Sequence, residues 1–243
     1  MMAEYDFKEG KKRILEIFDR PEENMIREKV PVDKDFTFDN GYYCWVTGIF
    51  VDIRNSTKLF SGYSAKKATA SKIIRSFTSE IIEILNTGDK MREIGIRGDC
   101  VYGIFTTPSK EDIFDVFQKA MYINAFIDVL NGVLRQKNLS PISVGIGVAS
   151  AQDLVLKAGR EGSGINSKVW IGEAVTKASN LSSVGSKGNL AAYSIVISES
   201  CHHNIKDVFE KTYGKNNLSH FNKTNIDGSV AYCCNLKVDD RKN

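Results

Sequence analysis

Hydrophobic and polar positions follow one another along the chain in patterns typical of both strands and helices. Residues 42–53 read YYCWVTGIFVDI, an aromatic and β-branched run with a single charge, which predicts a strand buried on both faces. Residues 91–105 contain two further β-like runs, and Gly98 and Asp99 between them are a pair that favours a tight turn. We therefore expect these residues to form a β-hairpin.

Apolar residues recur at helical spacing in two long segments, one on each side of the predicted hairpin. Residues 64–85 carry a broad apolar stripe that ends before Gly88. In residues 109–134 the apolar positions recur in the same way, and Ser109 with Asp112 matches the capping-box pattern. Each segment is predicted to form a helix.

The remaining chain predicts shorter elements. A strand over residues 143–150 has Gly at alternate positions, which predicts a close approach to its backbone. A strand at 154–156, a helix over 172–181 and a strand over 192–198 follow, and the tail from Cys201 is expected to add a helix and a hairpin. The order strand, helix, hairpin, helix, strand is that of the ferredoxin-like split βαβ arrangement. We therefore predict an α+β fold with an antiparallel-rich sheet flanked by helices.

These elements predict one domain with a short N-terminal addition. Residues 1–41 are expected to be a helical segment, because apolar side chains recur at helical spacing over residues 4–29, with a break near Pro21. Residues 42–200 contain the predicted sheet and its helices, and residues 201–243 complete the same domain. A chain of 243 residues with 42 % hydrophobic composition is long enough to bury such a core.

Composition narrows the classes of partner. The 33 Lys and Arg residues nearly balance the 30 Asp and Glu residues, which gives no electrostatic argument for binding nucleic acid. The five cysteines include no C-x-x-C pair, so neither a disulfide framework nor a zinc site is expected. No window approaches the roughly 20 apolar residues of a membrane span. We therefore predict a cytoplasmic protein with neither nucleic-acid nor membrane partners.

Two aspartates stand where a surface role does not explain them. Asp52 ends an apolar strand and Asp99 lies at the hairpin turn, so the fold is expected to bring the two carboxylates together. A carboxylate in such a place is costly without a cation, which indicates a shared divalent metal ion. The backbone N–H groups of the three residues that follow the strand could cradle phosphates: Asn55, Ser56 and Thr57. The alternative, that Asp52 caps a turn and Asp99 satisfies the hairpin, is left open by spacing alone.

Four ordered segments resemble the catalytic domain of class III nucleotidyl cyclases. They are FVDIRNST at 50–57, GDCVYGIF at 98–105, SVGIGVAS at 143–150 and GEAVTKASNL at 172–181. The last is similar to the family's G-D-x-V-N-x-A-S-R-M helix. Together the matches span residues 43–200, most of the chain, and their common order makes them far more specific than any one of them.

The resemblance implies an enzyme and its metal ligands. Asp52 and Asp99, with the backbone carbonyl of Ile53, would hold two divalent ions, Mn²⁺ or Mg²⁺. One ion would lower the pKa of the ribose 3′-hydroxyl and the other would neutralise the triphosphate, so that the 3′-oxygen attacks the α-phosphorus and pyrophosphate leaves. The family's head-to-tail homodimer would place the active sites between subunits.

The later helix departs from the family pattern. The Asn and Arg that orient the ribose and stabilise the transition state in the family align with Thr176 and Asn180. Both remain polar, so both are kept as candidate catalytic residues, but the site loses a positive charge. Three basic residues could replace that charge: Lys177, Arg160 or Lys223.

The base-reading positions depart as well. Adenylate cyclases carry Lys and Asp where this chain has Gly95 and Val169, and guanylate cyclases carry Glu at the first position. Arg97 should face the same way as Gly95, because strand side chains alternate, and a donor-only side chain suits the acceptor oxygens of uracil. Phe50 would narrow the pocket or stack on a small ring. UTP is therefore favoured over CTP as the substrate.

These departures resemble the cyclases of bacterial Pycsar antiphage systems, which make cyclic CMP or cyclic UMP. That resemblance implies a second messenger that acts on a separate effector after phage infection. Two alternatives stand beside it: a purine cyclase with unusual base contacts, and a degenerate cyclase domain that binds a nucleotide or partner without catalysis. The lost Arg favours the degenerate domain, whereas the retained Asp52 and Asp99 argue against it.

Overall fold

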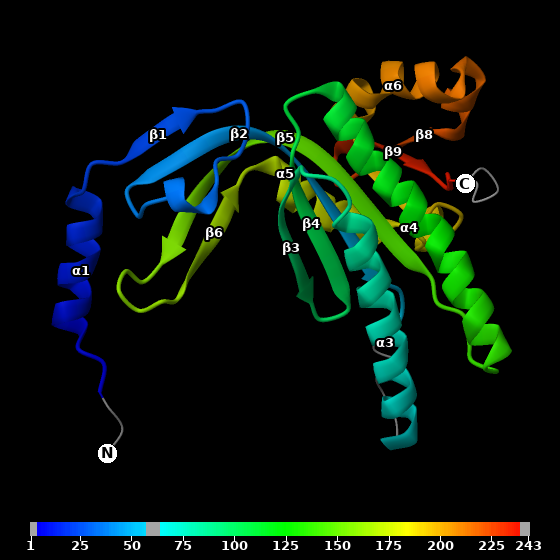
Figure 1. The fold of residues 1–243 in the computed structure, drawn as a ribbon, viewed down its shortest axis with the longest axis horizontal. Coiled ribbons are helices and arrows are strands. Elements are labelled where there is room, and N and C mark those ends of the chain that lie inside the picture. Colours follow the sequence, from blue (N-terminus) through cyan, green and yellow to red (C-terminus); the bar gives the residue numbers. More distant parts are fainter. Residues whose placement is uncertain (1–3, 57–63, 239–243) are drawn as a thin grey trace.

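A computed structural model of the protein describes residues 4–56 and 64–238 and shows an α+β fold (Figure 1). The elements in chain order are α1 (Phe7–Asp19), β1 (Glu23–Ile26), β2 (Asn40–Ile53), α3 (Ser64–Leu85), β3 (Met91–Arg97), β4 (Cys100–Thr106), α4 (Lys110–Gln136), β5 (Val144–Gly159), β6 (Asn166–Ile171), α5 (Glu173–Val184), β7 (Ile195–Ser198), α6 (Glu199–Tyr213), β8 (Asn222–Ile226) and β9 (Ser229–Cys234).

Within the described residues, nine strands form one sheet with β2 near its centre. The strand order is β3-β4-β2-β5-β7-β9-β8, with β1 paired to β2 and β6 paired to β5 outside this path. β2 runs antiparallel to both β4 and β5. The predicted pairing of the hairpin with the first strand is therefore confirmed.

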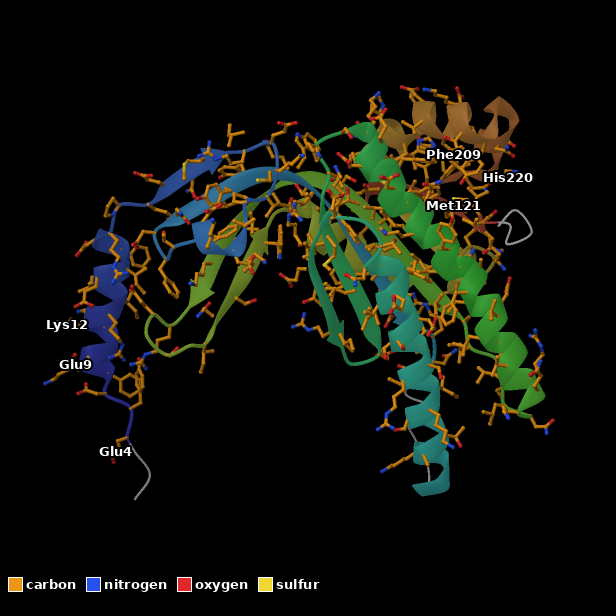
Figure 2. The ribbon with its side chains drawn as sticks, in the orientation of Figure 1. Glu4, Glu9, Lys12, Met121, Phe209 and His220 are labelled. Carbon is orange, nitrogen blue, oxygen red and sulfur yellow. The ribbon has the colours of Figure 1, made fainter. Side chains whose placement is uncertain are left out.

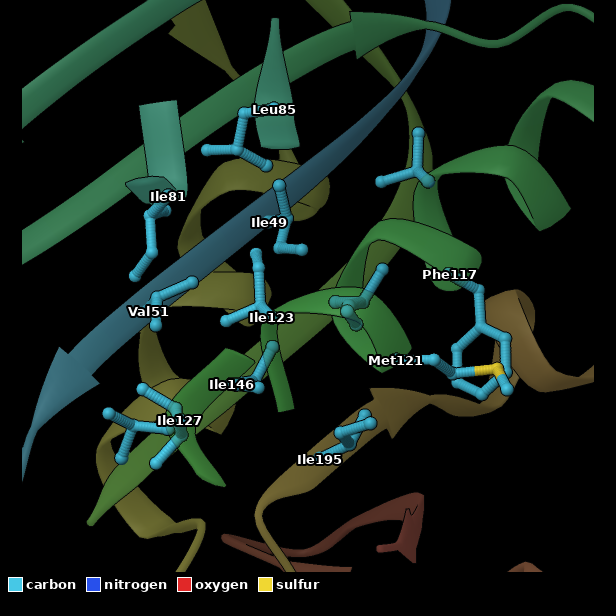
Figure 3. Close-up of a cluster of buried hydrophobic side chains, with 14 of the residues drawn as sticks. Ile49, Val51, Ile81, Leu85, Phe117, Met121, Ile123, Ile127, Ile146 and Ile195 are labelled. Carbon is cyan, nitrogen blue, oxygen red and sulfur yellow. The ribbon is translucent and has the colours of Figure 1, made fainter. Parts of the chain in front are cut away.

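The core lies between the sheet and the helices α3, α4 and α6. Side chains from β2 alternate, so Ile49 and Val51 enter this core while Phe50 and Asp52 face the other way. Figure 3 shows Ile49 and Val51 beside helix residues of the cluster, among them Ile81 and Leu85 of α3. The cluster continues through further fully or nearly fully buried residues: Phe117, Met121, Ile123, Ile146 and Ile195.

The capping box predicted at the start of α4 is confirmed. Ser109 and Asp112 each accept a hydrogen bond from the other's backbone N–H. The C-terminal end of the chain packs onto the same helix, because the Phe209 ring of α6 lies 6.1 Å from the Phe117 ring of α4. Figure 2 shows Phe209 near Met121 at one end of the molecule, whereas Glu9 of α1 lies at the other end.

The opposite face of the sheet is covered by α5. A Cβ atom at Gly147 would lie 2.0 Å from the Ala178 carbonyl oxygen, and one at Gly48 would lie 3.2 Å from the Ala174 carbonyl oxygen. The helix therefore sits against the strand backbones, and the close approach predicted from alternating glycines is confirmed. Ala174 and Ala178 are fully buried in this contact.

Three sequence-based expectations need correction. The segments predicted as separate strands at 143–150 and 154–156 belong to one long strand, β5. β6 was not predicted, because its short NSKVWI sequence follows a Gly- and Ser-rich turn and lacks a clear alternation. In the N-terminal segment predicted as helical, only α1 is a long helix, and Met25 and Ile26 lie in β1, which pairs parallel to β2.

Candidate active site

The face of the sheet under α5 carries three of the predicted site residues, Asp52, Phe50 and Arg97, in two neighbouring rows across the strands. Register aligns Asp52 of β2 with Cys100 of β4, and Cys100 with Arg97 of β3. The next row aligns Phe50 with Tyr102, and Tyr102 with Gly95. Arg97 therefore shares a face with Gly95, Phe50 and Asp52, as alternation predicts.

The carboxylates of Asp52 and Asp99 act on each other at the end of β2. Burial raises the pKa of the Asp52 carboxyl, Arg54 opposes that shift and Asp99 adds to it. The Asp52 side chain retains 28 % exposure. Two neighbouring carboxylates, one of them half-buried, are a charge arrangement that a divalent cation relieves.

Arg54 is a site residue that the sequence analysis missed. Its Nη1 donates to Asp52 Oδ2 at 2.8 Å, its Nε donates to the Gly185 carbonyl oxygen at 2.8 Å, and its Nη2 donates to the Ser182 carbonyl oxygen. Burial lowers its pKa, and its side chain is only 10 % exposed. The alternation used for Arg97 was the available signal, since Arg54 follows Asp52 by two residues.

The backbone at the end of β2 directs the Ile53 carbonyl to the β4 side of the strand. The Arg54 N–H donates to the Ser143 carbonyl oxygen at 2.8 Å, on the β5 side. Backbone groups of successive strand residues point to opposite sides, so the Ile53 carbonyl points toward β4 and the turn that carries Asp99. Asn55 follows at φ 55, a left-handed turn conformation. Ser56 comes next, and Thr57 lies outside the described residues.

The donor set fits a hard divalent ion. Two carboxylates and one backbone carbonyl are oxygen ligands of the kind that Mg²⁺ and Mn²⁺ take, and both ions commonly keep water or substrate phosphate as further ligands. The described residues contain no group of three or more His, Cys, Asp or Glu side chains arranged for a metal. A divalent ion here would therefore depend on nucleotide oxygens as well as on the protein.

Thr176 and Asn180 lie together on α5 but not beside the carboxylates. Both are exposed, and both line a cavity of about 740 Å³ with the start of α6 and the β8–β9 turn. They are four residues apart, on one face of the helix. Ala178 and Ser182 occupy the opposite face, which packs against the sheet and contacts Arg54. One chain therefore does not bring Thr176 and Asn180 to its own Asp52.

Asp153 fixes the start of α5. Its buried carboxylate accepts the Glu173 N–H at 2.9 Å and the Ala174 N–H at 3.2 Å. A Cβ atom at Gly172 would lie 2.1 Å from this carboxylate, so glycine is needed there. Asp153 was not predicted from the sequence, because nothing local distinguishes a buried aspartate in a strand from an exposed one.

The two positions that align with the family's base-reading residues, Gly95 and Val169, differ in orientation. Gly95 faces the site, and the ring of Tyr102 covers it at a distance that leaves no room for a side chain. Val169 pairs with Leu156 on the other face of the sheet and is 39 % exposed, whereas its neighbour Trp170 points to the face that carries Tyr102. Phe50 stacks on Tyr102 with ring centroids 5.1 Å apart.

Comparison with known proteins gives relatives over nearly the whole chain, although no protein-family profile matches. The chain is 51 % identical over 238 residues to a uridylate cyclase of Treponema porcinum, covering 98 % of this chain and 80 % of the relative. It is 33 % identical over 182 residues to a uridylate cyclase of Gulbenkiania mobilis, covering 73 % of this chain and 70 % of the relative.

Solved structures agree on the fold. The adenylyl cyclase CyaB from P. aeruginosa superposes with a TM-score of 0.63 at 21 % identity, covering 83 % of this chain and 97 % of that one. The guanylyl cyclase Cya2 superposes with a TM-score of 0.60 at 16 % identity, covering 82 % and 95 %. The fold is thus that of class III nucleotidyl cyclases, to which this chain belongs. Within that family it falls in the pyrimidine subgroup that the two uridylate cyclases represent.

Among the helices of residues 4–56 and 64–238, none is both long and apolar enough to cross a bilayer.

Proposed function

We propose that the protein converts UTP to 3′,5′-cyclic UMP and pyrophosphate. The observation that carries the proposal is the 51 % identity, over 98 % of the chain, to a uridylate cyclase. The site face supports it with Arg97, a donor-only side chain suited to the acceptor oxygens of uracil, and with Phe50. CTP is the nearest alternative substrate, since a backbone carbonyl could accept from the cytosine amino group.

In this proposal Asp52, Asp99 and the Ile53 carbonyl hold two divalent ions, Mn²⁺ or Mg²⁺. Bound there, the ions would supply activation of the ribose 3′-hydroxyl and neutralisation of the triphosphate. The 3′-oxygen loses its proton and bonds to the α-phosphorus, and the bond from that phosphorus to the pyrophosphate oxygen breaks. Arg54 donates to the Oδ2 oxygen of the Asp52 carboxylate and so holds the carboxylate in place.

The backbone after β2 is proposed to bind phosphate. Asn55, Ser56 and Thr57 follow the metal-binding strand directly, and backbone N–H groups in such a turn suit phosphate oxygens. The left-handed conformation of Asn55 turns the chain sharply at this point.

Two copies are proposed to build each site. Thr176 and Asn180 face away from the Asp52 of their own chain, toward a separate cavity. In a head-to-tail homodimer they would complete the partner's site, where Thr176 would orient the ribose and Asn180 would donate to the transition state. The family's Arg is absent from this chain, so in this proposal the positive charge comes from Lys177, Arg160 or Lys223.

The cellular role proposed is that of a messenger enzyme in Pycsar antiphage defence, with cyclic UMP acting on a separate effector. Residues 42–200 would be the catalytic unit, with residues 1–41 as an N-terminal addition. Residues 201–243 would complete the same domain, which the pairing of β9 with β7 supports.

The proposal is tested by the products formed from each nucleotide. Purified protein is incubated with Mn²⁺ and ATP, GTP, CTP or UTP in separate reactions, and products are identified by mass spectrometry. Cyclic UMP as the main product is expected. Cyclic AMP or cyclic GMP as the main product would contradict the base assignment, and no product from any nucleotide would favour a binding module without catalysis.

A further inference from the structure

The ring of Tyr102 fills the space that a side chain at position 95 would need. A Cβ atom built on Gly95 would lie 2.7 Å from three atoms of the Tyr102 side chain, closer than Cβ contacts occur in proteins. Either a longer residue at 95 or this position of Tyr102 is possible, but not both. The base-facing side of β3 is thus closed by an aromatic ring from β4.

Tyr102 is held in place from two sides. Its ring stacks on Phe50 with an interplanar angle of 13°. Its hydroxyl donates to Glu93 Oε1 at 2.9 Å, and the other carboxylate oxygen, Oε2, accepts the indole N–H of Trp170 at 2.8 Å. Burial, followed by Glu93, raises the pKa of Tyr102 to about 12, so the phenol stays protonated and keeps donating.

The Glu93 carboxylate joins strands that are not neighbours in the sheet. β3 and β6 are separated by β4, β2 and β5 in the strand order, yet Glu93 of β3 bonds to Trp170 of β6. In Figure 1 both strands lie beneath the arch formed by β2 and β5, which brings the two side chains within reach. A hydrogen-bonded carboxylate with both oxygens used is a fixed support for the Tyr102 ring.

We propose that Tyr102 is a specificity-determining residue that limits the base pocket to a single ring, and that Glu93 is a positioning residue that holds it. The inference rests on the proposed pyrimidine cyclase function. The ring occupies the space beside Gly95, on the face that carries Phe50 and Arg97. A purine there would meet the aromatic ring and would find no polar side chain at position 95.

The test compares product ratios from an equimolar mixture of UTP, CTP, ATP and GTP. Tyr102→Leu removes the ring, so kcat/KM for UTP is expected to fall about 10-fold while the purine share of the products rises about 10-fold, the range of one missing pocket contact. Tyr122→Leu, at an exposed tyrosine of α4, is the matched control and should keep the wild-type ratio.

Two further variants test the support that Glu93 gives to Tyr102 and the space that Tyr102 fills beside Gly95. In Glu93→Gln only one acceptor oxygen remains, because the amide nitrogen is a donor, so the amide cannot accept from both the Tyr102 hydroxyl and the Trp170 N–H. KM for UTP should therefore rise about 3-fold with kcat nearly unchanged, as for weakened substrate binding. Gly95→Ala adds the methyl group that Tyr102 excludes, so it should shift the product ratio even if Tyr102→Leu does not fold.

The outcomes separate the two proposals. A wild-type enzyme that makes cyclic UMP, with a folded Tyr102→Leu or Gly95→Ala variant that keeps the wild-type product ratio, overturns the role of Tyr102 alone. A wild-type enzyme that prefers a purine overturns both this inference and the proposed function. A larger share of cyclic purine nucleotides from the variants, with the product ratio of the control unchanged, supports the role of Tyr102 in limiting the base pocket.

Discussion

The residues around the Asp52 carboxylate at the end of β2 and the polar pair on α5 differ in their place within a single chain: the first set lies together, and the second lies apart from it. Asp52, Asp99 and Arg54 come together through strand register, and Arg54 ties the group to the carbonyl oxygens at the end of α5. Thr176 and Asn180 are exposed and face a cavity on the other side of that helix. The same helix therefore separates the two groups, as the proposed two-chain site requires.

The separation follows from residue size. Gly48 and Gly147 let α5 approach the sheet with its small residues inward. Helical geometry then turns the polar positions outward, and Asp153 fixes the start of the helix so that this orientation is maintained. Substitutions in each group can therefore test the two groups separately.

Asp52→Asn is expected to lower kcat for cyclic UMP formation by about 1000-fold, because a neutral amide does not replace a carboxylate that holds a divalent ion. The fold should persist, since the amide keeps the shape and still accepts from Arg54. Steady-state kinetics and thermal unfolding measure the two effects. A folded variant with a near-normal rate would show that Asp52 is not a metal ligand in catalysis.

Asn180→Ala is expected to lower kcat by about 10- to 100-fold with little change in KM, the range for losing one hydrogen-bond donor to the transition state. Ser179→Ala, at the neighbouring exposed position of α5, is the control and should keep the wild-type rate. Equal rates for both variants would remove Asn180 from the site.

Arg54→Met is expected to lower the free energy of unfolding by about 1–3 kcal/mol, because the carbonyl oxygens of Ser182 and Gly185 lose a buried donor. Activity should fall less than in Asp52→Asn, since the carboxylates remain. Urea unfolding checks the stability effect, with Arg135→Met at an exposed position of α4 as the control. Equal unfolding midpoints for the two variants would contradict a stabilising role for the hydrogen bonds from Arg54 to the end of α5.

A smaller effect is expected from His202, which lies outside both groups. Its ring stacks on Tyr232 with centroids 3.7 Å apart, and burial, with Lys206 and His203, lowers its pKa. Below about pH 6.5 the unfolded state binds a proton at His202 more readily than the folded state does. The contribution of His202 to the free energy of unfolding is therefore fully present above that pH and is lost as the pH falls. His202→Gln should flatten this slope in thermal unfolding without changing the base preference; an unchanged slope would assign the pH dependence elsewhere.

Sequence patterns predicted the parts of the fold that depend on local periodicity. The strand at 42–53, the hairpin at 91–105 and the capping box at Ser109 needed only alternation, turn chemistry and helical spacing. The strand β1 was missed because four residues carry no period of their own and pair only once β2 is present.

The site residues, too, were predictable from the sequence only where local periodicity places them. Alternation placed Arg97 on the face of Gly95, and the same rule applied from Asp52 places Arg54 on the face of Asp52. Contacts between distant strands were out of reach, because the bond from Glu93 to Trp170 depends on how the whole sheet curves. The covering of Gly95 by Tyr102 was missed for that reason, although both positions are in the predicted hairpin.

The most direct test of the two-chain site is to mix the Asp52→Asn and Asn180→Ala variants and measure cyclic UMP formation. Each variant alone is expected to keep a tenth of the wild-type rate or less, but a mixed dimer would contain one site with an intact Asp52 from one chain and an intact Asn180 from the other. Random exchange should therefore restore about one quarter of wild-type activity, as symmetric dimers require. Activity no higher than the mean of the two separate variants, in a mixture shown to exchange subunits, would contradict a site shared between chains.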